Sequence, residues 1–209
     1  MPTGNRRWFI LVVVVAVAAV VGLSSMVYAF ARSSTPPSLP QEGDSNWPAQ
    51  MGSMMRGWGY LNGNQLNSVT PSQPASAANG TLTYGGDSIR ILVLMGPMSK
   101  GLSMYSFVID NFTNPTLVLP RGAEVTMLVV NVDTDGYHGL TLTTVPPTYP
   151  YNLMPTMMDS FASSSVLPPS SSSGFASQQI SFTVDGGMYY VCPVPGHAQS
   201  GMYGQIMAV

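Results

Sequence analysis

The side chains best suited to chemistry lie near the end of the chain, in the segment Cys192-Pro-Val-Pro-Gly-His197-Ala-Gln-Ser-Gly-Met202. Cys192 is the only cysteine among 209 residues, and His197 is one of two histidines. A thiolate, an imidazole and a thioether therefore follow one another at intervals of five residues. Soft sulfur ligands combined with imidazole, with methionine as a weak axial ligand, are the donor set of mononuclear copper sites that transfer electrons. The other histidine, His138, can complete this set from a distant part of the chain.

Each of these residues has a simpler explanation when taken alone. A single cysteine is often a small buried hydrophobe, and a single histidine is often a hydrogen-bonded structural residue. Their joint occurrence in a loop stiffened by Pro193, Pro195 and Gly196 favours copper over coincidence. Zinc does not ordinarily take a thioether ligand. Two histidines are too few for additional catalytic coppers, and one cysteine is too few for a binuclear copper centre.

The segments that must position these ligands have the sequence pattern of β-strands. Short apolar-rich runs bounded by glycine, proline, asparagine or aspartate predict strands over 81–84, 88–95, 105–109, 116–119, 124–132, 138–144, 180–184, 188–191 and 204–209. With no convincing amphipathic helix among them, they indicate an all-β sandwich or barrel. Cys192 directly follows one predicted strand, Met202 leads into the last one, and His138 begins another after the turn 133–136.

One stretch interrupts this rhythm. Residues 145–177 contain six prolines and a run of serines. We expect a long surface loop here, with one helical turn around residues 155–161.

The N-terminal region has the composition of a membrane segment. Residues 8–31 are uncharged and rich in Val, Ala and Leu, and about 20 apolar residues span a bilayer core. Because Arg6 and Arg7 precede the run, the positive-inside tendency puts the rest of the chain outside the cytoplasm. A cleaved signal peptide is the alternative, since 29–31 resembles a cleavage site. We expect residues 1–32 to form the anchor or signal peptide, 33–79 a Ser/Pro/Gly-rich spacer, and 80–209 the copper domain.

The charge of the chain excludes some partners and suggests a setting. Residues 33–209 carry four basic against nine acidic residues, a formal charge of −5, so a nucleic-acid partner is not expected. Only 8% of the whole chain is charged. A fold that relies on few ionised carboxylates loses little stability when they protonate. We therefore hypothesise an acidic extracytoplasmic setting, with a compositional peculiarity at neutral pH as the alternative.

Residues 82–209 resemble rusticyanin and, less closely, the sulfocyanins, which are blue copper proteins. The resemblance is carried by Asn114-Pro-Thr-Leu-Val-Leu-Pro120, Gly136-Tyr-His138, Met154-Pro155 and above all the segment 188–204 with its Cys-x4-His-x4-Met spacing. It implies a cupredoxin Greek-key β-sandwich with His138, Cys192, His197 and Met202 as ligands of one type 1 copper. It also implies electron transfer, not enzymatic catalysis, towards a cytochrome c or a terminal oxidase in an acidophile's respiratory chain.

The chain departs from the family pattern in two respects. Gly139 follows His138 where rusticyanin-like proteins have serine, and the N-terminal segment would tether a carrier that is otherwise soluble. A different function also stays open, namely copper storage or delivery. It would use Met202 together with the methionines at 51, 54 and 55, although clustered methionines of this kind more often pack against the domain they precede. The colour of the copper-loaded chain separates the two functions.

Overall fold

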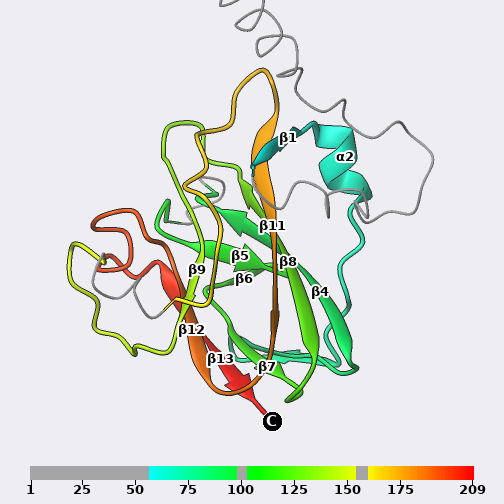
Figure 1. Ribbon diagram of the computed structural model, residues 1–209. Helices are drawn as coiled ribbons and strands as arrows, with labels where there is room; N and C mark the ends of the chain where they lie inside the picture. The colour runs from blue at the N-terminus through cyan, green and yellow to red at the C-terminus, as the bar shows by residue number, and fades with distance from the viewer. Residues whose placement is uncertain (1–56, 98–102, 154–159) are drawn as a thin grey trace, which may run out of the picture. The chain divides into compact units, whose positions relative to one another are not determined.

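The computed structural model describes residues 57–97, 103–153 and 160–209, and these residues form a β-sandwich of two mixed sheets (Figure 1). The expected membrane segment at residues 8–31 and the methionines at 51, 54 and 55 lie outside the described residues. Within the described ranges, none of the helices has the length and apolar character needed to cross a bilayer.

The first sheet has the strand order β1-β11-β8-β4-β5-β6. Its strands are β1 (Gly59–Leu61), β4 (Ser88–Met95), β5 (Phe107–Ile109), β6 (Phe112–Thr113), β8 (Glu124–Asn131) and β11 (Phe175–Thr183). β8 pairs antiparallel with β11 along its whole length and parallel with β4. Because side chains alternate between the faces of a strand, every second residue of β4, beginning at Ile89, is buried against the other sheet.

The second sheet has the order β10-β9-β12-β13-β7-β3-β2. Its strands are β2 (Ser76–Ala78), β3 (Thr81–Thr83), β7 (Thr116–Leu119), β9 (Thr141–Thr143), β10 (Ala162–Ser163), β12 (Met188–Val191) and β13 (Tyr203–Ala208). β12 lies between β9 and β13 and pairs antiparallel with both. The segment that joins β12 to β13 is the one that carries Cys192, His197 and Met202.

The core lies between the two sheets and anchors the base of that segment. Residues of both sheets contribute to one buried cluster, which also includes Cys192 and Met202. Tyr190 of β12 is fully buried, packs edge-on against Phe107 of β5, and donates its hydroxyl hydrogen bond to the carbonyl oxygen of Pro115. Because this large buried side chain lies two residues before Cys192, its packing fixes the position of the cysteine backbone.

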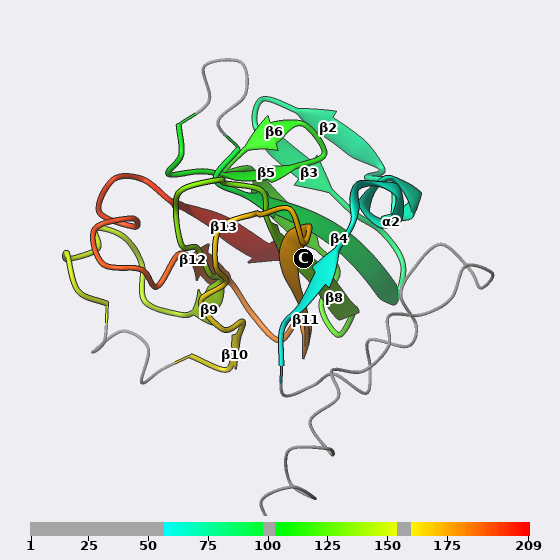
Figure 2. The same cartoon turned by 90° about the horizontal axis from the view of Figure 1, so that it is seen from above.

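The outer face of the first sheet is also covered. Leu61 of β1 packs with Leu128 and Val130 of β8 in a second buried cluster, to which Leu66 of α2 (Gly63–Ser68) contributes. α2 lies beside β4, away from β12 and β13 (Figure 2), and β1 pairs antiparallel with β11 at the edge of the first sheet. Residues 59–78, which composition groups with the spacer, thus contain β1, α2 and β2. Leu61 of β1 and Leu66 of α2 pack over the apolar outer face of β8, whereas β2 pairs with β3 in the second sheet.

Each expected strand overlaps an observed one, whereas the short strands β1, β2, β6 and β10 lie outside the expected ranges. His138 does not begin a regular strand; it forms an isolated antiparallel bridge with Leu167, and β9 starts three residues later. The expected surface loop 145–177 contributes this bridge partner, the short strand β10 and the start of β11. Most of the helical turn expected around 155–161 lies outside the described residues.

Candidate metal centre

Three of the candidate ligands lie on the single segment between β12 and β13. Cys192 immediately follows β12, and Met202 immediately precedes β13. The segment is closed by backbone hydrogen bonds: the N–H of Cys192 donates to the carbonyl of Met202 over 3.1 Å, and the N–H of Met202 donates to that of His197 over 3.0 Å. The three residues are therefore tied to one another before any metal is considered.

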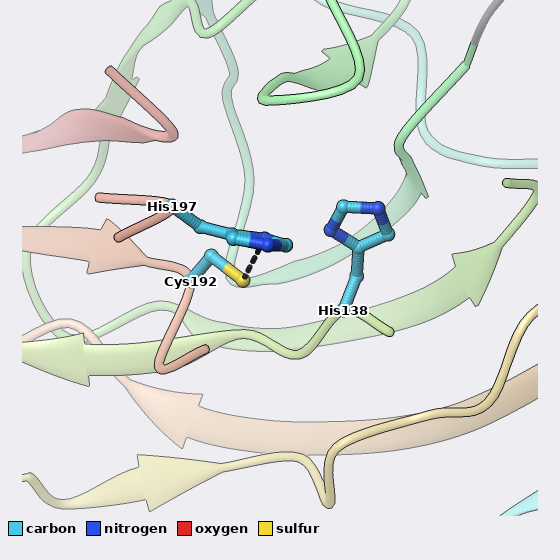
Figure 3. A group of neighbouring side chains, drawn as sticks. All are labelled: His138, Cys192 and His197. Carbon is cyan, nitrogen blue, oxygen red and sulfur yellow. Dashed lines mark hydrogen bonds between the residues drawn. The ribbon is translucent and has the colours of Figure 1, made fainter. Parts of the chain in front are cut away.

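His138 is brought to this segment from a different part of the chain. The backbone N–H and carbonyl of His138 both bond to Leu167, which holds the histidine in place beside β9. Its ring faces that of His197 (Figure 3), with ring centroids 4.9 Å apart. The ligand atoms of His138, Cys192 and His197 all lie within 4.8 Å of one another. The structure thus brings these three predicted residues together.

Most of the site is closed to solvent, and one of its side chains is partly exposed. His138, Cys192 and Met202 are fully buried, whereas His197 is partly exposed. The ring of Tyr105 packs edge-on against that of His197, at 5.0 Å between centroids. Met202 lies in the same buried cluster as Cys192. Among these four residues, His197 is the one through which the site meets solvent.

The Cys192 thiol is held as a neutral group in the absence of metal. Burial raises its pKa to about 11, although N–H groups of Gly139 and Val194 donate hydrogen bonds to the sulfur and oppose that shift. A metal that binds here must therefore displace a proton, as thiolate ligation requires. The backbone N–H of Gly139 thus donates a hydrogen bond to the sulfur although this residue has no side-chain hydroxyl.

Both imidazoles are held in the neutral form that ligates metals. Burial lowers the pKa of His138 below its ordinary value, and Asp133 offsets only part of this shift. Burial and the neighbouring His138 likewise lower the pKa of His197. Among the described residues the Nδ1 atom of His138 has no hydrogen-bond partner although it is buried, and the Nδ1 atom of His197 lies 3.5 Å from the Cys192 sulfur (Figure 3). Both Nδ1 atoms are thus available to a metal.

Sequence patterns did not indicate the residues that support His138. Asp133, treated there only as part of a turn, accepts a hydrogen bond from Nε2 of His138 at 2.9 Å with both side chains buried. The amide of Asn131 donates to the carbonyls of Gly136, Leu167 and Pro168. It thereby joins the end of β8, the following turn and the long loop. The one available signal was an acidic residue five positions before a candidate ligand.

A second asparagine secures the ligand segment. The side chain of Asn114 accepts a hydrogen bond from the N–H of Phe107 and donates one to the carbonyl of Gly201, the residue before Met202. Asn114 belongs to one of the segments on which the resemblance in sequence rests. Its two bonds connect β5 to the loop that presents Met202.

The donor set and its spacing fit a metal with short bonds to nitrogen and sulfur. Bonds of about 2.0 Å to nitrogen and 2.3 Å to sulfur, as zinc forms them, separate these donors by about 3.5 Å in tetrahedral geometry. The 3.5 Å between the Cys192 sulfur and Nδ1 of His197 meets this requirement. The unpartnered Nδ1 of His138 supplies the other imidazole donor. A β-sandwich of mixed sheets with a His-Cys-His cluster beside a buried methionine defines a cupredoxin.

Comparison with known proteins shows which cupredoxins this chain is similar to in sequence. No protein-family model matches the chain. Rusticyanin of Acidithiobacillus ferrooxidans is 28% identical over 144 residues, which cover 68% of this chain and 90% of the relative. Rusticyanin of Acidithiobacillus ferridurans is 27% identical over 160 residues, which cover 76% of this chain and 83% of that protein.

Solved structures agree with these relatives. The structure of rusticyanin from Thiobacillus ferrooxidans matches with a TM-score of 0.65 at 26% identity, covering 73% of this chain and 97% of the other. Another structure, described as that of the copper protein rusticyanin, matches with a TM-score of 0.65 at 25% identity, covering 73% of this chain and 98% of the other. The chain is a rusticyanin-like cupredoxin, and its site matches a type 1 copper site.

Proposed function

We propose that this protein is a membrane-anchored, extracytoplasmic blue-copper electron carrier in an acidophile's respiratory chain for iron or sulfur oxidation. The observation that carries the proposal is the cluster of His138, Cys192 and His197, whose ligand atoms lie within 4.8 Å of one another and of which only His197 is partly exposed. A thiolate with two imidazoles is the equatorial ligand set of copper sites that transfer electrons. An electron carrier needs only this metal site, and it needs no side chains that bind or transform a substrate.

In this proposal His138, Cys192 and His197 would hold the copper, with Met202 as the weakest donor. Copper, when bound, supplies one-electron chemistry by changing between Cu(I) and Cu(II). The protein's part is to hold the donors still: the backbone bonds among Cys192, His197 and Met202 keep them in one arrangement in both states. Little rearrangement is then required for each electron transferred.

The proposed electron port is His197. Its ring is partly exposed, whereas His138, Cys192 and Met202 are buried. Exposed aromatic residues, Tyr137 and Tyr151, occur in the neighbouring segments and suit contact with an apolar partner surface. An electron would pass through the His197 ring by an outer-sphere route, without a bond to the partner.

The proposed setting depends on the N-terminal sequence and the low charge. Residues 8–31 would anchor the chain, and the copper domain would face away from the cytoplasm. The partners would be a cytochrome c as donor or acceptor, or a terminal oxidase. Fractionation of the producing cells with a protease that cannot cross the membrane tests this arrangement: the copper domain should be cleaved from intact cells while the anchor stays in the membrane fraction.

Rapid mixing with a cytochrome tests the electron-carrier function. The full chain, solubilised in detergent and loaded with one equivalent of Cu(II), should oxidise reduced cytochrome c while its own visible absorption is lost in step. The same chain with Cys192→Ser should not. A chain that binds several Cu(I) ions, stays colourless with Cu(II) and leaves the cytochrome reduced would instead support copper storage or delivery.

A further inference from the structure

A buried carboxylate contacts the candidate ligand His138 from the side opposite the metal site. Nε2 of His138 and Oδ2 of Asp133 are 2.9 Å apart, and both side chains are fully buried. An ionised carboxylate only accepts hydrogen bonds, so the shared proton belongs to Nε2 of the neutral ring. The lone pair of Nδ1 is then free, and Nδ1 is the ring atom without a partner in the structure.

The carboxylate is itself held in a single orientation. Its Oδ1 atom accepts the N–H of Asp135 at 2.9 Å. The backbone of Asp133 is fixed on both sides, because its N–H donates to the side chain of Asn131 and its carbonyl accepts the N–H of Ser170. Because the backbone is fixed, the Asp133 side chain cannot turn away from His138 without breaking its bond to the N–H of Asp135.

Two glycines enclose the contact closely. A Cβ atom at Gly96, whose φ is +67°, would collide with Nε2 of His138 and would lie 2.8 Å from Cβ of Asp133. A Cβ atom at Gly136 would lie 2.6 Å from Oδ2 of Asp133 and 3.0 Å from Nε2 of His138. The backbone therefore approaches the pair at distances that no other residue type allows at these two positions. This packing favours a direct bond between the two side chains.

We infer that Asp133 is a positioning residue of the copper site: it holds His138 in the Nε2–H tautomer with Nδ1 facing the metal, and its negative charge lowers the reduction potential. This inference rests on the proposed function. A carboxylate bonded to the outer nitrogen of a ligating histidine fixes the ring and strengthens it as a donor. A negative charge close to the metal favours the oxidised state, Cu(II), over Cu(I).

The tautomer can be tested without copper. Imidazole 15N chemical shifts of the metal-free full chain, measured by NMR at neutral pH, should show His138 with the proton on Nε2. Asp133→Ala should give a mixture of tautomers. Asp133→Asn, which keeps the shape, offers one oxygen to two donors, the N–H of Asp135 and Nε2–H of His138, so it should also lower the Nε2–H fraction. Asp135→Asn removes the same charge from an exposed side chain of the same turn and should leave the spectrum unchanged.

The charge is tested on the copper-loaded chain. Asp133→Asn should raise the reduction potential so that the ratio of reduced to oxidised protein at a fixed potential increases about tenfold, which is 59 mV for one electron. Asp135→Asn should shift the ratio by much less. Loss of this supporting partner should also weaken Cu(II) affinity by about 10–100-fold.

Each result has a defined consequence. A metal-free wild-type chain with the His138 proton on Nδ1, or Asp133 variants with the wild-type tautomer, would overturn the positioning role. Equal potentials in the Asp133→Asn and Asp135→Asn chains would overturn the effect of charge. A wild-type chain that stays colourless with Cu(II) would contradict the proposed function, while the metal-free NMR result would still decide the tautomer.

Discussion

The sulfur of Cys192 lies 3.5 Å from Nδ1 of His197 although four residues separate them in the sequence. The intervening turn makes this possible, because the N–H of His197 bonds to the carbonyl of Val194 and that of Met202 bonds to the carbonyl of His197. The donors are thus preorganised by the backbone of the segment between β12 and β13. A metal that binds here would meet a site whose geometry is already formed.

The acid response of the metal-free chain should differ from that of the copper-loaded chain. Burial lowers the pKa of both His138 and His197 in the fold. Below the unfolded pKa of about 6.5, the unfolded chain binds more protons than the native one, so stability is present above this pH and decreases as pH falls towards the folded pKa values. The slope is at most about 1.4 kcal/mol per pH unit for each proton taken up on unfolding.

Guanidinium unfolding at pH 7 and pH 5, with and without copper, measures this difference. We expect copper to raise stability at both pH values but the copper-loaded chain to lose more between them than the metal-free chain, because its ligating imidazoles and Cys192 thiolate take up protons only on unfolding. The pKa of Asp133 is lowered in the fold, so any stability lost when its carboxylate takes up a proton is lost below pH 5. A metal-free chain that loses no stability between pH 7 and pH 5 would contradict the neutral state of the two histidines, and an equal loss in both forms would contradict copper ligation by the Cys192 thiolate.

Restoring a serine after His138 should destabilise this chain. A Cβ atom at Gly139 would lie 3.2 Å from Cγ of Pro193 and 3.2 Å from the carbonyl oxygen of Ser165, which is closer than packed atoms ordinarily approach. We expect Gly139→Ser to cost about 1–3 kcal/mol, as overpacking usually does.

Thermal unfolding of the metal-free chain measures this cost. Gly186→Ser is the matched control, since nothing lies within 4 Å of a Cβ atom at that glycine. Equal melting temperatures for the two variants would show that Pro193 and the Ser165 segment move aside without cost.

Residues before the predicted start of the domain should contribute to its stability. Leu61 of β1 is 3% exposed and packs against Leu128 and Val130 on the outer face of the first sheet. Leu61→Ala should cost about 2–5 kcal/mol, by analogy with other buried leucines. Met207→Ala, at a side chain 45% exposed, should change stability by less than about 0.5 kcal/mol. The denaturant midpoints of the two variants measure this difference. Equal midpoints for Leu61→Ala and Met207→Ala would mean that β1 does not unfold cooperatively with the rest of the domain.

Much of the site could be predicted because its ligands are local in sequence and rare in type. The segment from Cys192 to Met202 contains three of the four, and the only other histidine had to supply the fourth. Strands such as β4, β7 and β12 were recognised because their apolar residues end sharply at Gly, Pro or Asp. The supporting Asp133 was missed because an aspartate in a turn has the same appearance whether it caps the turn or binds a distant side chain.

The spacer boundary could not be drawn from composition alone. β1, α2 and β2 are short and lie among Ser, Asn, Gln and Pro, so they lack a periodic apolar signal. For β1 and α2 the only signal lies in the strand that they help to cover: the run Met127-Leu128-Val129-Val130 in β8 is apolar on both faces, which indicates cover on both sides of the sheet. The bridge between His138 and Leu167 joins distant segments and has no local pattern.

The visible absorption spectrum of the full chain loaded with one equivalent of Cu(II) tests the central claim most directly. The type 1 site predicts an intense blue band that arises from the Cys192 thiolate, and Cys192→Ser should abolish it while the near-ultraviolet circular dichroism of the fold is retained. A colourless wild-type chain that has bound Cu(II), or an equally blue Cys192→Ser chain, would contradict this account.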